Sequence, residues 1–97
     1  MALFINNSYI FYFYHIEKGN FMELKQLEYF RAIVDAGTIS GAARDLHMTQ
    51  PPLSYQIKML EEELQVPLFL RGKKRITLTE AGKTLYEQAG NLLILSD

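Results

Sequence analysis

The sequence predicts a mainly α-helical domain that includes one small β-hairpin. Apolar residues recur at helical spacing between residues 23 and 65. A Thr-Gln-Pro-Pro segment at residues 49–52 divides this region, and residues 68–79 alternate like two short strands around a basic turn. The chain has 97 residues, 48% of them hydrophobic, so it has room for one small domain with an ordinary core. We therefore do not expect an enzyme of several domains.

Two helices are expected before the Thr-Gln-Pro-Pro segment. The first spans residues 23–36 and ends at Gly37. Its expected core face consists of Leu24, Leu27, Phe30, Ile33 and Val34. Thr38 can cap the second helix, at residues 39–47. In that helix the residues expected to be buried are Ala42, Ala43 and Leu46, and those expected to face outward are Arg44 and Asp45.

The third expected helix spans residues 50–65. Thr49 is expected to supply a capping hydroxyl, and Pro51 and Pro52 are compatible with a first turn, whose amides have no intrahelical partners. At about 100° per residue, a narrow core stripe is formed by Leu53, Ile57, Leu60 and Leu64. The outer face contains Pro51, Tyr55, Lys58 and Glu62. Its first half is polar or basic and its second half acidic, so only the first half suits DNA. Two short helices with such a turn are typical of a helix-turn-helix, which presents the start of its second helix to the major groove.

Charge is segregated along the chain. The formal net charge of −1 gives no global attraction to nucleic acid. Three acidic residues at 61–63 precede a basic turn made of Arg71, Lys73, Lys74 and Arg75, with Gly72 permitting the tight turn. Such a run is most often a solvated turn, but beside a helix-turn-helix we favour contact with phosphate or the minor groove. The low total charge predicts that useful affinity depends on dimerisation and base contacts.

The last helix is expected to begin at Thr79 and Glu80. One seam runs along it through Gly82, Leu85, Ala89, Leu92 and Ser96, with Tyr86 and Leu93 beside it. The seam can pack on its own domain or on a second chain. We favour the second chain, because few residues are left to cover the seam within one domain.

Residues 1–21 differ from the rest, being rich in aromatic and strand-forming residues. They have no basic start followed by a small-residue cleavage site, and the apolar run is too short for a membrane span. A non-functional upstream extension is the favoured interpretation, and a packing or self-association element is the alternative.

Motifs for catalysis are absent. There is no cysteine, and the two histidines, His15 and His47, have no ligand partner nearby in sequence, so we expect no metal and no cofactor. We find no glycine-rich phosphate loop or nucleophile elbow. We therefore expect that the chain is not an enzyme.

From Met22 to about Asp97 the chain resembles the DNA-binding domain of LysR-type bacterial transcriptional regulators. The matching segments are Glu23 to Phe30, Thr49 to Ser54, Leu68-Phe69, and Leu78 to Gly82. The resemblance implies a winged helix-turn-helix, with a three-helix body and a two-stranded β wing at residues 22–78. A long linker helix at residues 79–97 would follow, through which two chains form a homodimer. It also implies a larger effector-binding domain that this chain lacks, so a small-molecule inducer would act only on a full-length protein.

The resemblance implies sequence-specific binding of double-stranded DNA in the cytoplasm, at the bacterial nucleoid, with no membrane partner. The groove-facing end of the third helix would be lined by Thr49, Gln50, Pro51, Pro52 and Ser54. Gln50 is the best direct reader, because its amide can pair with an adenine edge in both directions. The family frequently has arginine at position 55, whereas Tyr55 offers a hydroxyl and a ring able to touch a thymine methyl.

The full set of expected DNA-binding residues adds Thr38, Tyr55, Lys58, Arg71, Lys73, Lys74 and Arg75, and the expected dimer interface is Leu85, Tyr86, Ala89, Leu92 and Leu93. Two other functions compete with this one. A winged helix can be a protein-interaction module without DNA binding, which the near-zero net charge would favour. A surface-associating module that uses the aromatic extension is less favoured, because that segment has no basic face for anionic lipid.

Overall fold

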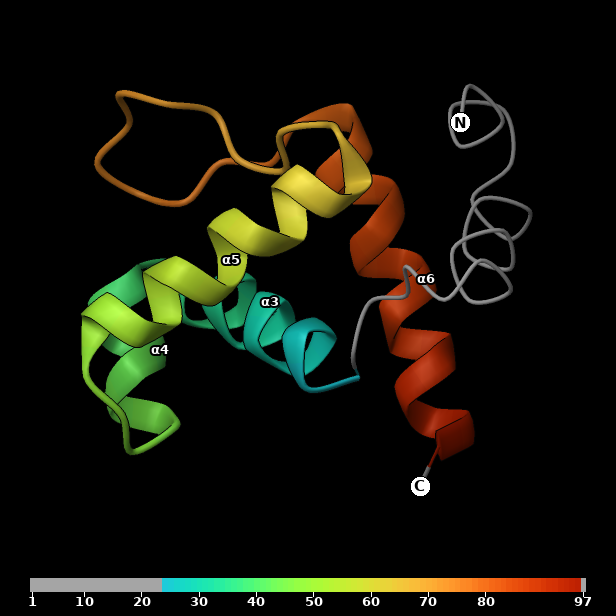
Figure 1. Ribbon diagram of the computed structural model, residues 1–97, viewed down its shortest axis with the longest axis horizontal. Coiled ribbons are helices and arrows are strands. Elements are labelled where there is room, and N and C mark those ends of the chain that lie inside the picture. Colours follow the sequence, from blue (N-terminus) through green and yellow to red (C-terminus); the bar gives the residue numbers. More distant parts are fainter. Residues whose placement is uncertain (1–23, 97) are drawn as a thin grey trace.

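The computed structural model describes residues 24–96, with side chains described up to residue 90. Within this range it contains four helices: α3 (Leu24–Ala36), α4 (Ile39–Asp45), α5 (Gln50–Leu64) and α6 (Glu80–Ser96). The prediction of a mainly α-helical domain is confirmed. Helices α3, α4 and α5 pack on one another, and α6 packs against α3. In Figure 1 the hairpin and the start of α5 lie on the left of the molecule and α6 lies on the right. The expected aromatic extension, residues 1–21, lies outside the described residues.

The core draws on every helix and on the start of the hairpin. Its buried members are Leu27, Phe30, Ile33, Ala42, Ala43, Leu53, Ile57, Leu60, Leu64, Leu68, Leu85 and Ala89. The Phe30 ring also contacts that of Phe69, with 5.5 Å between the ring centroids. The predicted core stripe of α5 is confirmed in full.

Helix α3 buries a face that is rotated from the expected one. Leu24 is 42% exposed, whereas Gln26 is buried and its Nε2 donates a hydrogen bond to Gln56 Oε1 on α5 at 3.3 Å. The buried face is centred between Gln26 and Leu27, and at about 100° per residue Leu24 falls about 130° from that centre. The prediction that Leu24 is a core residue is therefore wrong.

The turn between α3 and α4 follows the sequence closely. Gly37 has a φ of 83°, and its N–H donates to Ile33 O at 2.9 Å. Thr38 Oγ1 accepts a hydrogen bond from the Gly41 N–H at 3.0 Å, which confirms its capping role. Helix α4 ends at Asp45, earlier than expected, because His47 adopts a left-handed φ of 58°.

Thr49 stands at the N-cap position of α5 but makes no capping hydrogen bond through its side chain, so the predicted cap is wrong. A capping hydroxyl accepts from the N–H of the second or third helical residue. Those residues are Pro51 and Pro52, which have no N–H. The prolines that favour a helix start here also remove the donors that a cap would use.

Residues 68–79 form a hairpin that we call the wing. Its two sides meet in an isolated antiparallel bridge between Phe69 and Leu78. The Leu70 N–H donates to Thr77 O at 2.8 Å, and the Thr79 N–H donates to Leu68 O at 3.0 Å. The wing is thus less regular than the two short strands expected. Gly72, in the turn, has a φ of 77°, as a tight turn there requires.

The start of helix α6 is hydrogen-bonded to the residue before the wing, and the helix packs on the core. Thr79 Oγ1 accepts from the Gly82 N–H at 3.0 Å and donates to Pro67 O at 2.8 Å. A methyl group added at Gly82 would collide with Leu68 O, so this helix approaches the wing backbone as closely as a glycine allows. No helix in the described range is long and apolar enough to cross a membrane.

Candidate nucleic-acid interface

The start of α5 is an exposed, polar helix end. The expected groove-facing residues Thr49, Gln50, Pro51, Pro52 and Ser54 are all exposed. Four residues at a helix start lack an intrahelical acceptor for their N–H groups, and here two of them are proline. Fewer backbone donors than usual are therefore offered to an anion. The polar groups that remain are the Thr49 hydroxyl, which no amide engages as a cap, the Gln50 amide and the Ser54 hydroxyl.

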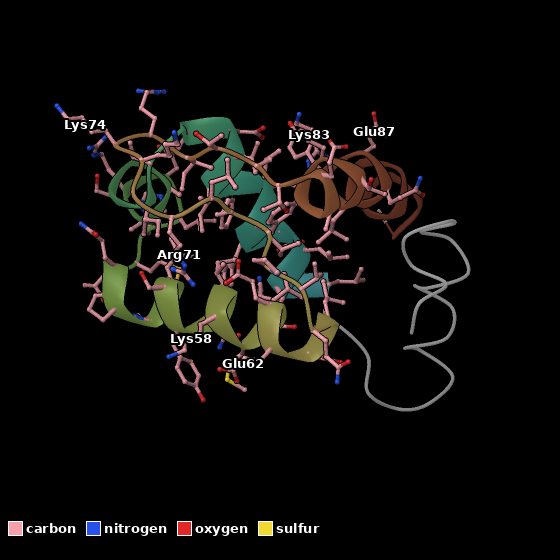
Figure 2. All side chains as sticks on the ribbon, turned by 90° about the horizontal axis from the view of Figure 1, so that it is seen from above. Lys58, Glu62, Arg71, Lys74, Lys83 and Glu87 are labelled. Carbon is pink, nitrogen blue, oxygen red and sulfur yellow. The ribbon has the colours of Figure 1, made fainter. Side chains whose placement is uncertain are left out.

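Further along the outer face, α5 becomes apolar and then acidic. The Tyr55 side chain is 59% exposed, and Met59 is also exposed one turn later. Lys58 and Glu62, labelled along α5 in Figure 2, both line the groove between this helix and the base of the wing. Both are exposed, as the sequence predicts.

The basic residues of the wing divide into two groups. Lys73 and Lys74 are exposed at its turn, and Lys74 lies at its tip in Figure 2. Arg71 and Arg75 each contact the body of the domain. Arg71 Nη2 lies 3.7 Å from Glu61 Oε1, and a methyl group added at Gly37 would collide with Arg75 Nη2.

The far side of the wing is anchored to the turn before α4. The Ile76 N–H donates to Gly37 O at 2.9 Å, next to the contact that Arg75 makes with Gly37. Thr38, expected to bind DNA, follows Gly37 directly and is half-buried, with its hydroxyl engaged as a cap. The structure thus brings the wing and the helix-turn-helix together, and Thr38 acts within it as a capping residue.

A shallow groove of about 270 Å³ separates the second half of α5 from the base of the wing. It is lined by Lys58, Glu61, Glu62, Gln65, Val66, Pro67 and Arg71. These side chains mix both signs of charge. No group of three or more His, Cys, Asp or Glu side chains in the described part of the chain could hold a metal ion.

The first half of the expected dimer seam is covered by the domain itself. Leu85 is 2% exposed and Ala89 is 0% exposed within a single chain, where α6 packs on α3. The Tyr86 hydroxyl donates to Asp35 Oδ1 at 2.5 Å, and the Arg31 guanidinium carbon lies 5.0 Å from the centre of its ring. Leu85 and Ala89 are therefore core residues and cannot form a free seam. The side chains of Leu92 and Leu93 lie outside the described ones.

Sequence reasoning missed Glu61, which it treated only as part of an acidic run. In the structure its carboxylate contacts three residues at the start of the wing. A signal was available, because at about 100° per residue Glu61 lies about 80° from Leu53, at the border of the core stripe. Glu62 lies roughly opposite the stripe and is exposed.

The comparison with known proteins settles the family. Residues 24–83 match the family described as bacterial regulatory helix-turn-helix protein, lysR family, which is well over half of the chain. This chain belongs to the lysR family. The HTH-type transcriptional regulator BudR of Klebsiella aerogenes is 50% identical over 76 residues, which cover 78% of this chain and 53% of that protein. The regulator ClcR of Pseudomonas putida is 46% identical over 76 residues, or 78% of this chain and 26% of ClcR.

Solved structures of the family match the fold as well as the sequence. The BenM DNA-binding domain in complex with benA site 1 DNA has a TM-score of 0.77 and 43% identity, over 78% of this chain and 85% of that one. The CbnR DNA-binding domain in complex with DNA has a TM-score of 0.74 and 43% identity, over 77% of this chain and 86% of that one. The predicted winged helix-turn-helix fold is thereby confirmed. The chain spans about half of the BudR protein and about a quarter of ClcR.

Proposed function

We propose that this chain binds double-stranded DNA sequence-specifically, as the DNA-binding domain of a LysR-type transcriptional regulator. The observation that supports this best is the exposed polar start of α5, on the same side of the molecule as the basic wing (Figure 1). A helix end can enter the major groove while a wing reaches the flanking backbone or the minor groove. The DNA-binding domains of BenM and CbnR, both solved in complex with DNA, support the same function.

The start of α5 would read the bases. The Gln50 amide can donate to and accept from an adenine edge in the major groove, and Ser54 can bond to any of several bases. The Thr49 hydroxyl is released from capping by the two prolines, so it is available to a phosphate or a base. Lys58, exposed on the same helix, would contact a phosphate.

The wing would add contacts that do not depend on sequence. Lys73 and Lys74 are exposed at its turn, with Arg71 and Arg75 nearer the body. Each phosphate neutralised by such a residue releases a counterion, which makes the affinity depend on salt.

A homodimer formed through α6 also belongs to this proposal, but through a different surface from the seam at Leu85 and Ala89. The sequence places four consecutive apolar residues, 92–95, in the last turns of α6. Four consecutive positions cover most of the helix circumference, so a single neighbouring element cannot cover all of them. We propose that a second copy covers the remainder. Changing Leu92 and Leu93 to Glu should give a folded monomer in sedimentation, and a variant that stays dimeric would refute this interface.

The remaining assignments complete the proposal. Residues 22–78 would form the DNA-binding unit, residues 79–97 the linker helix, and residues 1–21 an extension. A small-molecule inducer would act on an effector domain in a full-length protein. The chain would act in the bacterial cytoplasm, at the nucleoid, without enzymatic activity of its own.

Fluorescence anisotropy with genomic and random duplexes over a series of salt concentrations tests this function. We expect at least one genomic duplex to bind more tightly than random DNA by a factor on the order of a thousand or more, with affinity falling as salt rises. The near-zero net charge favours one competing function, a protein-interaction module. That function would be supported if no duplex bound at low salt.

A further inference from the structure

The carboxylate of Glu61 joins the recognition helix α5 to the start of the wing. The Leu68 N–H donates to Glu61 Oε2 at 2.7 Å, and the Phe69 N–H donates to the same oxygen at 3.3 Å. The other oxygen, Oε1, lies 3.7 Å from Arg71 Nη2. The Glu61 side chain is only 12% exposed, so water competes weakly for its two backbone hydrogen bonds. The Arg71 side chain is 86% exposed, so solvent screens the ion pair and the two amides make the stronger contacts.

These contacts fall where the wing leaves the body. The far side of the wing is anchored to the turn before α4 through the Ile76 N–H and Gly37 O. Its near side holds the Leu68 and Phe69 amides, and both use the Glu61 carboxylate as acceptor. A charged acceptor shared by two successive amides fixes the direction of the backbone there, because both N–H groups must point at one oxygen. Figure 2 shows Arg71 pointing from the wing toward α5, as its ion pair with Glu61 requires.

We propose that Glu61 is a positioning residue for DNA recognition, which sets the angle between the wing and α5. It touches no DNA itself. This inference rests on the proposed DNA binding. With the wing held at this angle, the wing's cations and the start of α5 can contact one duplex together. If Glu61 is removed, the near side of the wing loses an acceptor for two amides and Arg71 loses its partner.

The sign of the effect separates this role from simple electrostatics. Removing a negative charge from a DNA-binding helix should by itself strengthen DNA binding, because it lowers the repulsion between the helix and phosphate. A positioning role predicts the opposite for Glu61→Ala. Glu62 is the matched control, since it is the next residue on the same helix, has the same charge and is exposed.

Hydrogen exchange in the free protein tests the contact without DNA. In Glu61→Ala the Leu68 and Phe69 amides should exchange roughly tenfold faster relative to the amide of Ile57, a core residue of α5. In Glu61→Gln, which keeps one oxygen acceptor, the increase should be smaller, and in Glu62→Ala it should be absent. The Gln variant still tests the contact if the Ala variant fails to fold. Unchanged relative exchange in both Glu61 variants would refute the contact, even if the wild-type chain binds DNA well.

Anisotropy on a bound duplex tests the consequence. Glu61→Ala should weaken specific binding by on the order of tenfold and lower the salt slope, while Glu62→Ala should bind equally or more tightly. In a chain whose Lys73, Lys74 and Arg75 are already Ala, adding Glu61→Ala should cost much less than it does in the wild-type chain, because little charge is left on the wing to position against phosphate. Equal tightening by both Glu variants, or fully additive effects, would overturn the positioning role. Failure of the wild-type chain to bind any duplex would instead refute the proposed function.

Discussion

Leu85 offers a test of whether the first half of α6 belongs to the core of one chain or to an interface between two. Its side chain is 2% exposed in the single chain, so Leu85→Ala removes buried methyl groups and leaves a cavity. Such changes cost about 2–5 kcal/mol. In a domain of this size each kcal/mol lowers the melting temperature by about 4–8 °C, so we expect a fall of roughly 8–40 °C.

The assay is thermal unfolding followed by circular dichroism, repeated at low and high micromolar protein concentrations. If Leu85 is a core residue, the fall caused by Leu85→Ala should be the same at both concentrations. If instead Leu85 lies between two chains, unfolding would be coupled to dissociation, and the fall would depend on concentration.

Leu85→Met is the matched control, because it nearly conserves volume and should cost less than about 1.5 kcal/mol. A Leu85→Ala variant that melts like the unmodified chain when dilute, and differs from it only at high concentration, would refute the packing of α6 on α3. It would also support the dimer seam that the sequence predicts at Leu85.

Three further predictions concern the DNA interface. Gln50→Ala should weaken specific binding by about 1–3 kcal/mol at one base position while random DNA binds almost as before; an equal loss of affinity for both in anisotropy would count against base reading by Gln50. Changing Lys73, Lys74 and Arg75 to Ala should weaken binding to most duplexes and reduce the salt slope by up to about 0.9 for each phosphate that is no longer neutralised; an unchanged slope would assign these residues to solvent. Replacing thymine by uracil at successive positions of the bound duplex removes only the methyl group. In the wild-type chain this should weaken binding at one position, and in Tyr55→Ala it should have no effect there. The same weakening in both chains would exclude Tyr55 as the residue that touches the methyl group.

The parts of the fold that follow from local rules were predictable from the sequence. The core stripe of α5 needs only the helical repeat, and the end of α3 needs only the conformational freedom of Gly37. The Thr38 cap is equally local, because its acceptor and donor are three residues apart. In each case the residues that decide the structure are neighbours in the chain.

Two of the errors arise where segments far apart in the chain meet. Leu24 has the right spacing for the core, but the face that α3 buries is rotated toward Gln26, which bonds across to α5. The seam on α6 was recognised as an apolar face, but at Leu85 and Ala89 it is covered within one chain. Periodicity shows that Leu85 and Ala89 must be covered, but it does not show whether α3 or a second chain covers them.

The two prolines of α5, Pro51 and Pro52, determine whether the hydroxyl of the preceding residue, Thr49, is used as a helix cap. Ser or Thr before a helix is normally engaged by an amide of the first turn, and in that state its oxygen is largely committed. At Pro51 and Pro52 that amide does not exist, so Thr49 keeps the N-cap position without the bond. The same prolines reduce the number of backbone donors at the helix end, so in the proposed interface the side chains of Thr49 and Gln50 would make contacts that main-chain amides make elsewhere. A side chain can distinguish one base edge from another, whereas an amide that faces a phosphate cannot. In the proposed interface this helix end would therefore contribute more to sequence reading than to general attraction to the DNA backbone.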